Sequence, residues 1–190
     1  MFADILSFLV GVVTSFFVYL LLARFHFQWL RVSFRNPIGD FVLGTTGWMV
    51  VPARRIVPPL GGIDLATLVL AWAIQLAAEY ALFSIHGREF GPAPGAMLGL
   101  LAVLALLELA RFSIHILVFA VVVQAVLSWV NPDTPIGPLL DQVTRLFLRP
   151  IRRVLPLLGN VDLSPLVLLV ALQVLLLVLD ALEARAAAIF

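Results

Sequence analysis

The chain has 190 residues, of which 63% are hydrophobic and 12% are charged, and its mean hydropathy is +1.12. A water-soluble domain is nearer half apolar and a quarter charged, so this composition excludes a soluble globular fold and predicts a protein that lies in a lipid bilayer. The formal net charge of +1 gives no sign of nucleic-acid binding, and the lack of cysteine excludes disulfides, thiolate metal sites and cysteine nucleophiles. Asp4 precedes the first apolar run and no basic residue does, unlike the start of a cleaved secretory signal.

Three segments are predicted directly as membrane-spanning helices. Residues 5–23 carry no charge, residues 65–83 are interrupted only by Gln75 and Glu79, and residues 163–182 contain Gln173. Helices of about 20 residues cross the hydrocarbon core, where every backbone polar group must be satisfied within the segment. Runs of this length without alternation of apolar and polar residues favour helices over strands.

A further hydrophobic segment, residues 97–130, is too long for one untilted span. It also contains Glu108, Arg111 and His115. We favour one long helix whose end extends beyond the membrane, because an internal repeat aligns Leu6–Val32 with Leu104–Val130. The alternative is an interfacial or re-entrant piece at 97–107, followed by a span at 112–130. Both divisions give four spans in total.

A fourteen-residue element occurs twice and defines the architecture. Pro52–Leu65 recurs as Pro150–Leu163, 98 residues later, with eight of the fourteen positions identical. The sequence therefore predicts an all-α membrane protein with about four transmembrane helices, arranged as two tandem parallel repeats of helix, basic amphipathic linker and helix. We expect a first module at residues 1–86, a connection at 87–96 and a second module at 97–190.

The arginines predict the topology. All twelve basic residues are arginine, and nine of them lie in or beside the two linkers: Arg24, Arg31, Arg35, Arg54, Arg55, Arg145, Arg149, Arg152 and Arg153. Cytoplasmic loops carry the excess of basic residues in membrane proteins. We therefore expect both linkers on the cytoplasmic side and both termini outside.

The second linker has the pattern of an amphipathic helix. From Pro138 to Leu155 the apolar residues share one face and the charged residues share the other, as in a helix that lies in the headgroup region. We expect Pro150 to end or kink this helix. The first linker is a weaker copy, because Gly44, Gly47 and two threonines dilute its helix signal.

The linker arginines have two interpretations. The linker helices either rest on the membrane or form a docking surface for a lipid headgroup or a protein partner. Cytoplasmic anionic lipid favours each nearby arginine by about 1 kcal/mol. In the docking interpretation the contact residues are Arg54, Arg55, Arg145, Arg149, Arg152 and Arg153.

Asp64 and Asp162 each follow a glycine-containing turn and precede an apolar run. This is the position of a helix N-cap, where a carboxylate accepts hydrogen bonds from free backbone N–H groups. Ser164 and Pro165 strengthen the cap signal in the second half, since proline is tolerated in the first helical turn. The alternative role of both aspartates is an ion pair with the nearby Arg-Arg, which would fix each linker against its span.

Seven polar residues lie at or near membrane depth: Gln75, Glu79, Glu108, Arg111, His115, Gln124 and Gln173. Such residues are costly in lipid and are candidates for function. Glu108 and Arg111 lie three positions apart on one helix and can neutralise each other. A proton or ion path would use Glu79, Glu108 and His115, whereas the alternative is a helix-packing network in which Gln75 and Gln173 form a symmetric interhelical contact.

Signs of catalysis are lacking. The sequence has no Ser/His/Asp order, phosphate-binding glycine loop or paired-carboxylate motif, so we expect no enzyme, and no cofactor or metal. A bis-histidine haem site needs two histidines on facing helices at similar depth, and only His26 and His115 meet that condition.

With the doubled Pro-x-Arg-Arg-x-x-Pro, Gly and Asp-Leu element, and with Asn36-Pro37 and Ser128-Trp129 upstream, the chain resembles the YggT family of small integral membrane proteins over nearly its whole length. The resemblance implies about four spans in two tandem modules, in the bacterial cell (inner) membrane or a plastid. It also implies links to osmotic-stress tolerance, to division and envelope processes and, in plastids, to cytochrome assembly with haem attachment. The chain departs from the family at Trp48 and Leu146, where members often have proline, and at Ala66-Thr67, where the second half has Ser-Pro.

The leading hypothesis is a non-enzymatic multi-pass scaffold or assembly and stress-tolerance factor. Its basic linkers would contact membrane lipid, a membrane-protein partner or a second copy of the chain, because the repeated residues lie in the linkers rather than in the spans. An oligomeric transport or ion-permeation element is the alternative, based on Glu79, Glu108 and His115. Haem handling is a third hypothesis that rests on the family resemblance alone, and we expect no nucleic-acid partner.

Overall fold

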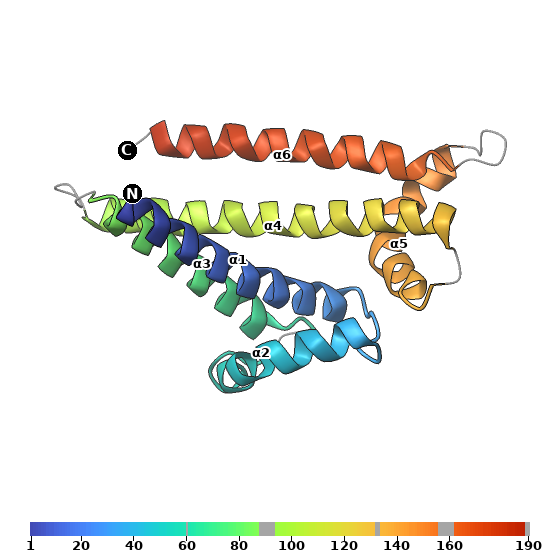
Figure 1. The fold of residues 1–190 in the computed structure, drawn as a ribbon, viewed down its shortest axis with the longest axis horizontal. Helices are drawn as coiled ribbons and strands as arrows, with labels where there is room; N and C mark the ends of the chain where they lie inside the picture. Colours follow the sequence, from blue (N-terminus) through green and yellow to red (C-terminus); the bar gives the residue numbers. More distant parts are fainter. Residues whose placement is uncertain (60, 88–93, 132–133, 156–161, 189–190) are drawn as a thin grey trace.

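The computed structural model describes residues 1–59, 61–87, 94–131, 134–155 and 162–188, and these residues form six α-helices (Figure 1). The helices are α1 (Phe2–Trp29), α2 (Pro37–Ile56), α3 (Leu65–Ile85), α4 (Pro94–Val130), α5 (Gly137–Val154) and α6 (Ser164–Ala188). Four of them, α1, α3, α4 and α6, are long and apolar enough to cross a membrane. The prediction of an all-α membrane protein with four spans is confirmed.

The helices that contain the spans are longer than the apolar runs that predicted them. α1 extends to Trp29 rather than residue 23, and α6 extends to Ala188 rather than residue 182. α4 is one uninterrupted helix of 37 residues, which confirms the long-helix interpretation of residues 97–130. At about 1.5 Å per residue, α4 is longer than the hydrocarbon core is thick, so part of it extends beyond the core.

The four spans alternate in direction. In Figure 1, α1 and α4 run from the end of the molecule that holds both termini toward the end that holds α2 and α5, and α3 and α6 run back. Both linker helices therefore lie at one end, called the linker side from here on. Both termini lie at the other end.

Each half has the same set of helix contacts. α1 packs against α2 and α3, and α2 packs against α3; likewise α4 packs against α5 and α6, and α5 packs against α6. The halves meet where α4 packs against α3 and α1, around Val18, Leu21, Ala71 and Leu109. Many large apolar side chains on the outer faces of the spans are exposed, as expected of helices whose outer faces contact lipid.

α1 ends in a tight turn that directs the chain into the first linker. The N–H of Val32 donates to the carbonyl of Phe27 at 2.7 Å, and the N–H of Arg31 donates to that of Gln28 at 3.1 Å. This is the Schellman arrangement, in which the left-handed residue is usually glycine; here it is Arg31, with φ of +55°. Phe27 and Val32 share a buried apolar cluster, so packing stabilises a backbone conformation that is unfavourable for arginine.

The first linker forms a continuous helix despite its weaker helix signal. α2 runs through Gly44 and Gly47. Asn36 caps its start, with Oδ1 accepting the N–H of Gly39 at 2.9 Å. The cap and the packing of α2 on α1 and α3 outweigh the low helix propensity of the glycines.

α5 is amphipathic, and buried residues of its apolar face pack against the spans. Leu139, Leu140, Val143 and Leu148 are buried against α4, α6 and the end of α1. Pro150 does not end the helix, which continues to Val154. The arginines of α5 are exposed.

Candidate functional site

The repeated arginine and aspartate of each linker come together in space. Arg54 Nη2 lies 2.6 Å from Asp64 Oδ2, and Arg152 Nε lies 2.9 Å from Asp162 Oδ2. We call these pairs the first clasp (Arg54–Asp64) and the second clasp (Arg152–Asp162). Each clasp joins the end of a linker helix to the start of the next span, which is the ion pair that the sequence left as the alternative to capping.

The turn before α3 allows Asp64 to cap the helix and form the clasp at once. Gly61 and Gly62 have φ of +59° and +84°, in the left-handed region that glycine adopts without strain. Asp64 is the N-cap of α3 and accepts hydrogen bonds from the hydroxyl of Thr67 at 2.5 Å and from its backbone N–H at 3.4 Å. One carboxylate therefore starts the span and holds the linker helix against it.

Asp162 makes equivalent contacts in the second half. The N–H of Ser164, at the start of α6, donates to Asp162 Oδ1 at 2.9 Å, and the Ser164 side chain bonds to the same carboxylate. The hydroxyl that reaches the aspartate thus comes from Thr67 in the first half and from Ser164 in the second. The first half lacks the Ser-Pro of the second half, but Thr67 supplies the hydroxyl that bonds to the aspartate.

The first clasp is much more enclosed than the second. Gln28 of α1 lies against it, with its amide oxygen 2.7 Å from Arg54 Nη2 and its nitrogen 2.9 Å from Asp64 Oδ2 when the amide is oriented for hydrogen bonding. Asp64 is 4% exposed, whereas Asp162 is 31% exposed. The same pair of residues therefore lies in two different environments.

Both aspartates have a pKa below the ordinary value. Burial raises the pKa of Asp64, but hydrogen bonds from Arg54 and Thr67 and the charge of Arg54 outweigh it. At Asp162 burial also raises the pKa, and the hydrogen bonds from Ser164 and Arg152 outweigh it. Both carboxylates are therefore ionised at neutral pH, so both clasps are charged.

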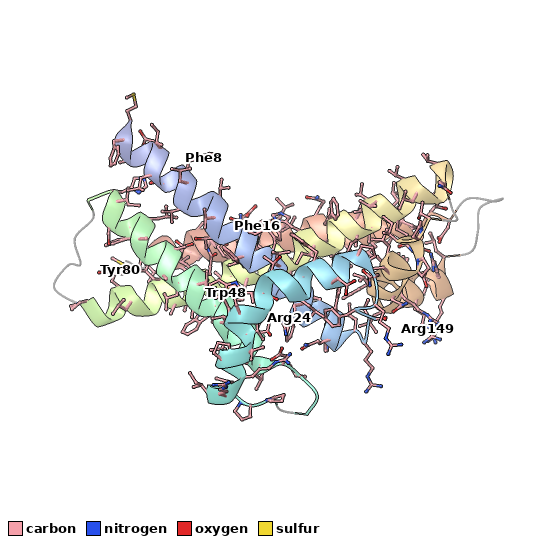
Figure 2. The ribbon with its side chains drawn as sticks, turned by 60° about the horizontal axis from the view of Figure 1, so that its bottom comes forward. Phe8, Phe16, Arg24, Trp48, Tyr80 and Arg149 are labelled. Atoms are coloured by element: carbon pink, nitrogen blue, oxygen red, sulfur yellow. The ribbon has the colours of Figure 1, made fainter. Side chains whose placement is uncertain are left out.

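The other four arginines of the predicted contact set are exposed. They are Arg55, Arg145, Arg149 and Arg153. None of the four makes an ion pair with a residue in the described ranges. Arg149 lies at the linker side, at the opposite end of the molecule from Tyr80 (Figure 2). The predicted set is thus divided: Arg54 and Arg152 belong to the clasps, and these four present their guanidinium groups outward.

A second polar cluster lies within the spans, between α4 and α6. Arg111 lies 3.7 Å from Glu108, which is the contact predicted from their spacing. Asp180 and Glu183 of α6 lie closer to the guanidinium, at 2.9 and 2.5 Å. Charged groups at membrane depth normally pair inside the bundle, and this cluster joins the two spans of the second half.

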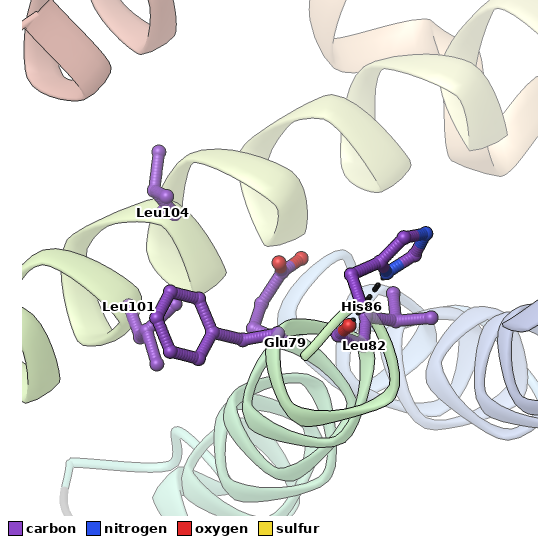
Figure 3. A pocket seen from close by; sticks show the side chains of 6 residues that line it. Glu79, Leu82, His86, Leu101 and Leu104 are labelled. Atoms are coloured by element: carbon purple, nitrogen blue, oxygen red, sulfur yellow. Dashed lines mark hydrogen bonds between the residues drawn. The ribbon is translucent and has the colours of Figure 1, made fainter. Parts of the chain in front are cut away.

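Glu79 lies beside a cavity at the end of the molecule away from the linkers. Its carboxylate accepts a hydrogen bond from Gln75 Nε2, one turn earlier on α3, at 3.1 Å. His86 Nδ1 donates to the carbonyl of Leu82 at 2.7 Å. Figure 3 shows the Glu79 carboxylate in the space between α3 and α4. The cavity, of about 250 Å³, is lined by Glu79, Leu82, Phe83, His86, Leu101 and Leu104.

The two candidate haem ligands have different surroundings. His115 Nδ1 lies 3.4 Å from the hydroxyl of Tyr19, which joins α4 to α1. His26 Nδ1 instead donates to the carbonyl of Leu22 in its own helix, at 2.6 Å.

The repeated glutamines also differ. Gln75 is buried in α3, whereas Gln173 is exposed on α6. Among the residues that the structure describes, Gln173 therefore does not form the symmetric interhelical contact predicted for this pair.

Two buried threonines are site features that sequence reasoning missed. Arg24 Nη1 donates to Thr46 Oγ1 at 2.9 Å, and the hydroxyl of Thr144 donates to Gln124 Oε1 at 2.6 Å. In each half, a polar residue near the end of the first helix thus bonds to the threonine in the middle of the linker helix. The available signal was a threonine repeated at the offset of 98.

The two threonine contacts have different spacings in the two halves. The threonines lie 98 residues apart, but their partners Arg24 and Gln124 lie 100 residues apart. These two contacts favour an offset of 100 for the first helices, whereas the linker elements keep the offset of 98. Arg24 and Thr46 are 22 positions apart, and Gln124 and Thr144 are 20 positions apart.

Comparison with known proteins agrees with this architecture. The sequence model of one family, CCB3/YggT, matches two stretches of the chain, residues 3–85 and residues 103–182. The chain belongs to the CCB3/YggT family. It is 35% identical over 161 residues to PA0392 of Pseudomonas aeruginosa, covering 84% of this chain and 80% of that protein. It is 34% identical over 171 residues to YggT of Escherichia coli K12, covering 89% and 86%.

Membership of the CCB3/YggT family confirms the resemblance drawn from the doubled linker element. No solved structure matches the chain.

Proposed function

We propose that this CCB3/YggT protein is a non-enzymatic scaffold of the bacterial inner membrane whose linker side faces the cytoplasm and binds anionic lipid headgroups. The clasps hold each linker helix at the start of a span. The exposed arginines then contact the phosphates of the lipid. The observation that carries the proposal is the division of the repeated Arg-Arg: the first arginine forms a clasp in both halves, and the second, Arg55 or Arg153, is exposed.

The surroundings of Arg55 favour lipid over a water-soluble protein partner. Phe41, Trp48 and Arg55 are spaced seven residues apart, so they share one side of α2. Both aromatic side chains are exposed, at 54% and 69%. Aromatic rings on the same side of a helix as a basic side chain are typical of the membrane–water interface, where the rings lie at headgroup level and the cation reaches the phosphates.

The orientation follows from the same residues. Nine of the twelve arginines lie in or beside the linkers, at one end of the molecule. Basic residues accumulate on the cytoplasmic side of membrane proteins, and this leaflet carries the anionic lipid. Each exposed arginine at that surface is favoured by about 1 kcal/mol.

The test measures lipid retention. Wild-type protein and the variant Arg55→Gln/Arg145→Gln/Arg149→Gln/Arg153→Gln are extracted from bilayers that contain equal amounts of phosphatidylglycerol and phosphatidylcholine, and bound lipids are counted by native mass spectrometry. The variant is expected to retain fewer phosphatidylglycerol molecules and the same number of phosphatidylcholine molecules. Arg185→Gln is the matched control, because Arg185 is an exposed arginine near the far end of α6.

Equal retention of phosphatidylglycerol in wild type and variant overturns the assignment of lipid as ligand. In-membrane crosslinking of the same proteins then tests whether the arginines bind an acidic protein partner instead of lipid. Such a partner should be crosslinked in wild type and lost in the quadruple variant. A loss of the same size in Arg185→Gln also counts against the proposal, since it indicates attraction by overall charge.

An oligomeric transport or ion-permeation element is the second candidate function. It is favoured by Glu79, which lies beside a cavity between two spans, and by the carboxylates around Arg111. Ion flux into proteoliposomes should then fall at least severalfold in Glu79→Gln and Glu108→Gln. Flux that is unchanged in both variants argues against this function.

A further inference from the structure

The interface between α3 and α4 joins the two halves of the chain, and the corresponding faces lie on α6 and α1, the last and first helices. α3 packs against α4 where the halves meet. By the order of helices, α6 corresponds to α3, and α1 corresponds to α4. Within one chain, α6 packs against α4 and α5, and α1 packs against α2, α3 and α4. α6 therefore has a face that corresponds to the face of α3 covered by α4, and α1 has a face that corresponds to the face of α4 covered by α3.

The face of α3 that contacts α4 is exposed on α6. Trp72 Nε1 donates to the carbonyl of Ala102 in α4 at 3.1 Å, and Leu68 and Glu79 line cavities together with residues of α4. The counterparts of Leu68, Trp72 and Glu79, 98 residues later, are Leu166, Val170 and Leu177. All three lie more than half exposed, at 61%, 59% and 67%.

The face of α4 that meets the first half is exposed on α1. Leu101, Ala105 and Leu109 are buried, with at most 5% of each residue exposed. With the offset of 100, their counterparts are Met1, Ile5 and Leu9, which are 95%, 52% and 52% exposed. Phe8, in the first turns of α1, is 68% exposed and lies at the edge of the molecule in Figure 2.

A polar residue on the α6 face distinguishes a protein neighbour from lipid. Gln75 is buried in α3, and its counterpart Gln173 is exposed near the middle of α6. An amide that faces hydrocarbon leaves its hydrogen-bonding groups unsatisfied, whereas a neighbouring helix satisfies or covers them.

We propose that this protein assembles head to tail in the membrane, with α1 of one copy packed on α6 of the next as α4 packs on α3. The directions of the helices permit this contact. α1 and α4 run in the same direction, as do α3 and α6, so the next copy has the same orientation in the membrane. The contact joins two different surfaces, and its repetition forms a ring or an open chain. It uses the spans and is independent of lipid binding at the linker side.

Disulfide formation between single cysteines tests the contact, and the natural chain has no cysteine to interfere. Leu68 packs against the apolar cluster that contains Leu109, so Leu166 and Leu9 of adjacent copies should lie together. The variants Leu9→Cys and Leu166→Cys, with different tags, are co-expressed and oxidised in the membrane. The expected product is a mixed dimer of the two tags. Each variant expressed alone should stay monomeric, and the double variant should give a ladder of oligomers.

Val178→Cys paired with Leu9→Cys is the control, because Val178 and its α3 counterpart Tyr80 are both exposed. A mixed dimer with Val178 as abundant as that with Leu166 overturns the proposal, as does a lack of mixed dimer with Leu166. Dimers of either single variant alone indicate a symmetric contact and also overturn it. A measurement without substitutions, native mass spectrometry of wild-type protein extracted with its surrounding lipid, should find more than one copy; single copies throughout contradict the assembly.

Discussion

The first and second clasps contain the same residue types at the same spacing, and each joins a linker helix to the span that follows. Their environments differ. Asp64 is almost wholly buried and accepts hydrogen bonds from Arg54, Thr67 and, in the oriented amide, Gln28. About a third of the Asp162 side chain is exposed, and its partner Arg152 is also exposed.

The difference arises outside the repeated element. Gln28 of α1 covers the first clasp, and Arg24 of the same helix lies nearby and bonds to the linker at Thr46. At the offset of 100, Ser128 of α4 replaces Gln28. A repeated motif therefore sets which residues pair, while the neighbouring helix sets how much the pair contributes to stability. Exposed ion pairs contribute about 0–1 kcal/mol, and removing one partner of a buried pair costs about 3–5 kcal/mol.

The largest effect is expected from Arg54→Ala. It leaves Asp64 ionised and buried without its cation, so the free energy of unfolding should fall by about 3–5 kcal/mol. Reversible unfolding by SDS in mixed micelles, followed by circular dichroism, measures it. The neighbouring variant Arg55→Ala is the control and should change stability by no more than about 0.5 kcal/mol. If Arg54→Ala lowers the free energy of unfolding by less than about 1 kcal/mol, the first clasp contributes no more than an exposed ion pair.

Acid should weaken the first clasp. The pKa of Asp64 is lower in the folded protein than in the unfolded chain, where it is about 3.9. Its contribution to stability is therefore fully present above the unfolded pKa and is lost as the pH falls through the folded pKa. We expect the free energy of unfolding to decline below about pH 4, and to decline less steeply in Asp64→Asn. An identical acid slope in the two proteins would contradict this assignment.

The second clasp should respond weakly to the matched substitution. Arg152→Ala removes an exposed partner of a partly exposed carboxylate, so the free energy of unfolding should fall by about 0.2–1 kcal/mol. The same SDS titration measures it beside Arg54→Ala. If the two variants lose equal stability, burial by α1 does not govern the strength of the clasps.

Salt should produce the smallest effect and should separate the two clasps. Raising the ionic strength to about 1 M shortens the screening length to about 3 Å, which weakens exposed pairs much more than buried ones. The loss caused by Arg152→Ala should shrink by a few tenths of a kcal/mol, whereas the loss caused by Arg54→Ala should remain. Unfolding titrations at low and high salt compare them. Equal shrinkage in both variants argues that the first clasp is open to solvent.

The spans, the clasps and their repetition could be predicted from the sequence because they depend on local signals. Long apolar runs indicate helices, and the repeated Arg-Arg and Asp lie only ten residues apart. The pairing of Arg111 with Glu183 could not be predicted in the same way, because 72 positions separate them and the contact requires the relative rotation of α4 and α6.

Other features depended on packing between distant helices. The sequence identified α5 as amphipathic, but periodicity alone does not show that residues of its apolar face pack on α4 and α6. The glycines of α2 and Pro150 of α5 lower helix propensity locally, and packing on the spans overrides them. The different spacing of the Arg24–Thr46 and Gln124–Thr144 contacts is also invisible in the linker repeat.

Double-mutant cycles on the two clasps test the central comparison most directly. One cycle uses Arg54→Ala, Asp64→Ala and the double variant, and the other uses Arg152→Ala, Asp162→Ala and their double variant. Loss of the helix cap is common to both aspartate variants of a cycle, so it cancels and leaves the coupling energy of the pair. We predict a coupling of about 2–3 kcal/mol in the first clasp and below about 1 kcal/mol in the second. Equal couplings, or a stronger coupling in the second clasp, would contradict the conclusion that burial by α1 strengthens the first clasp.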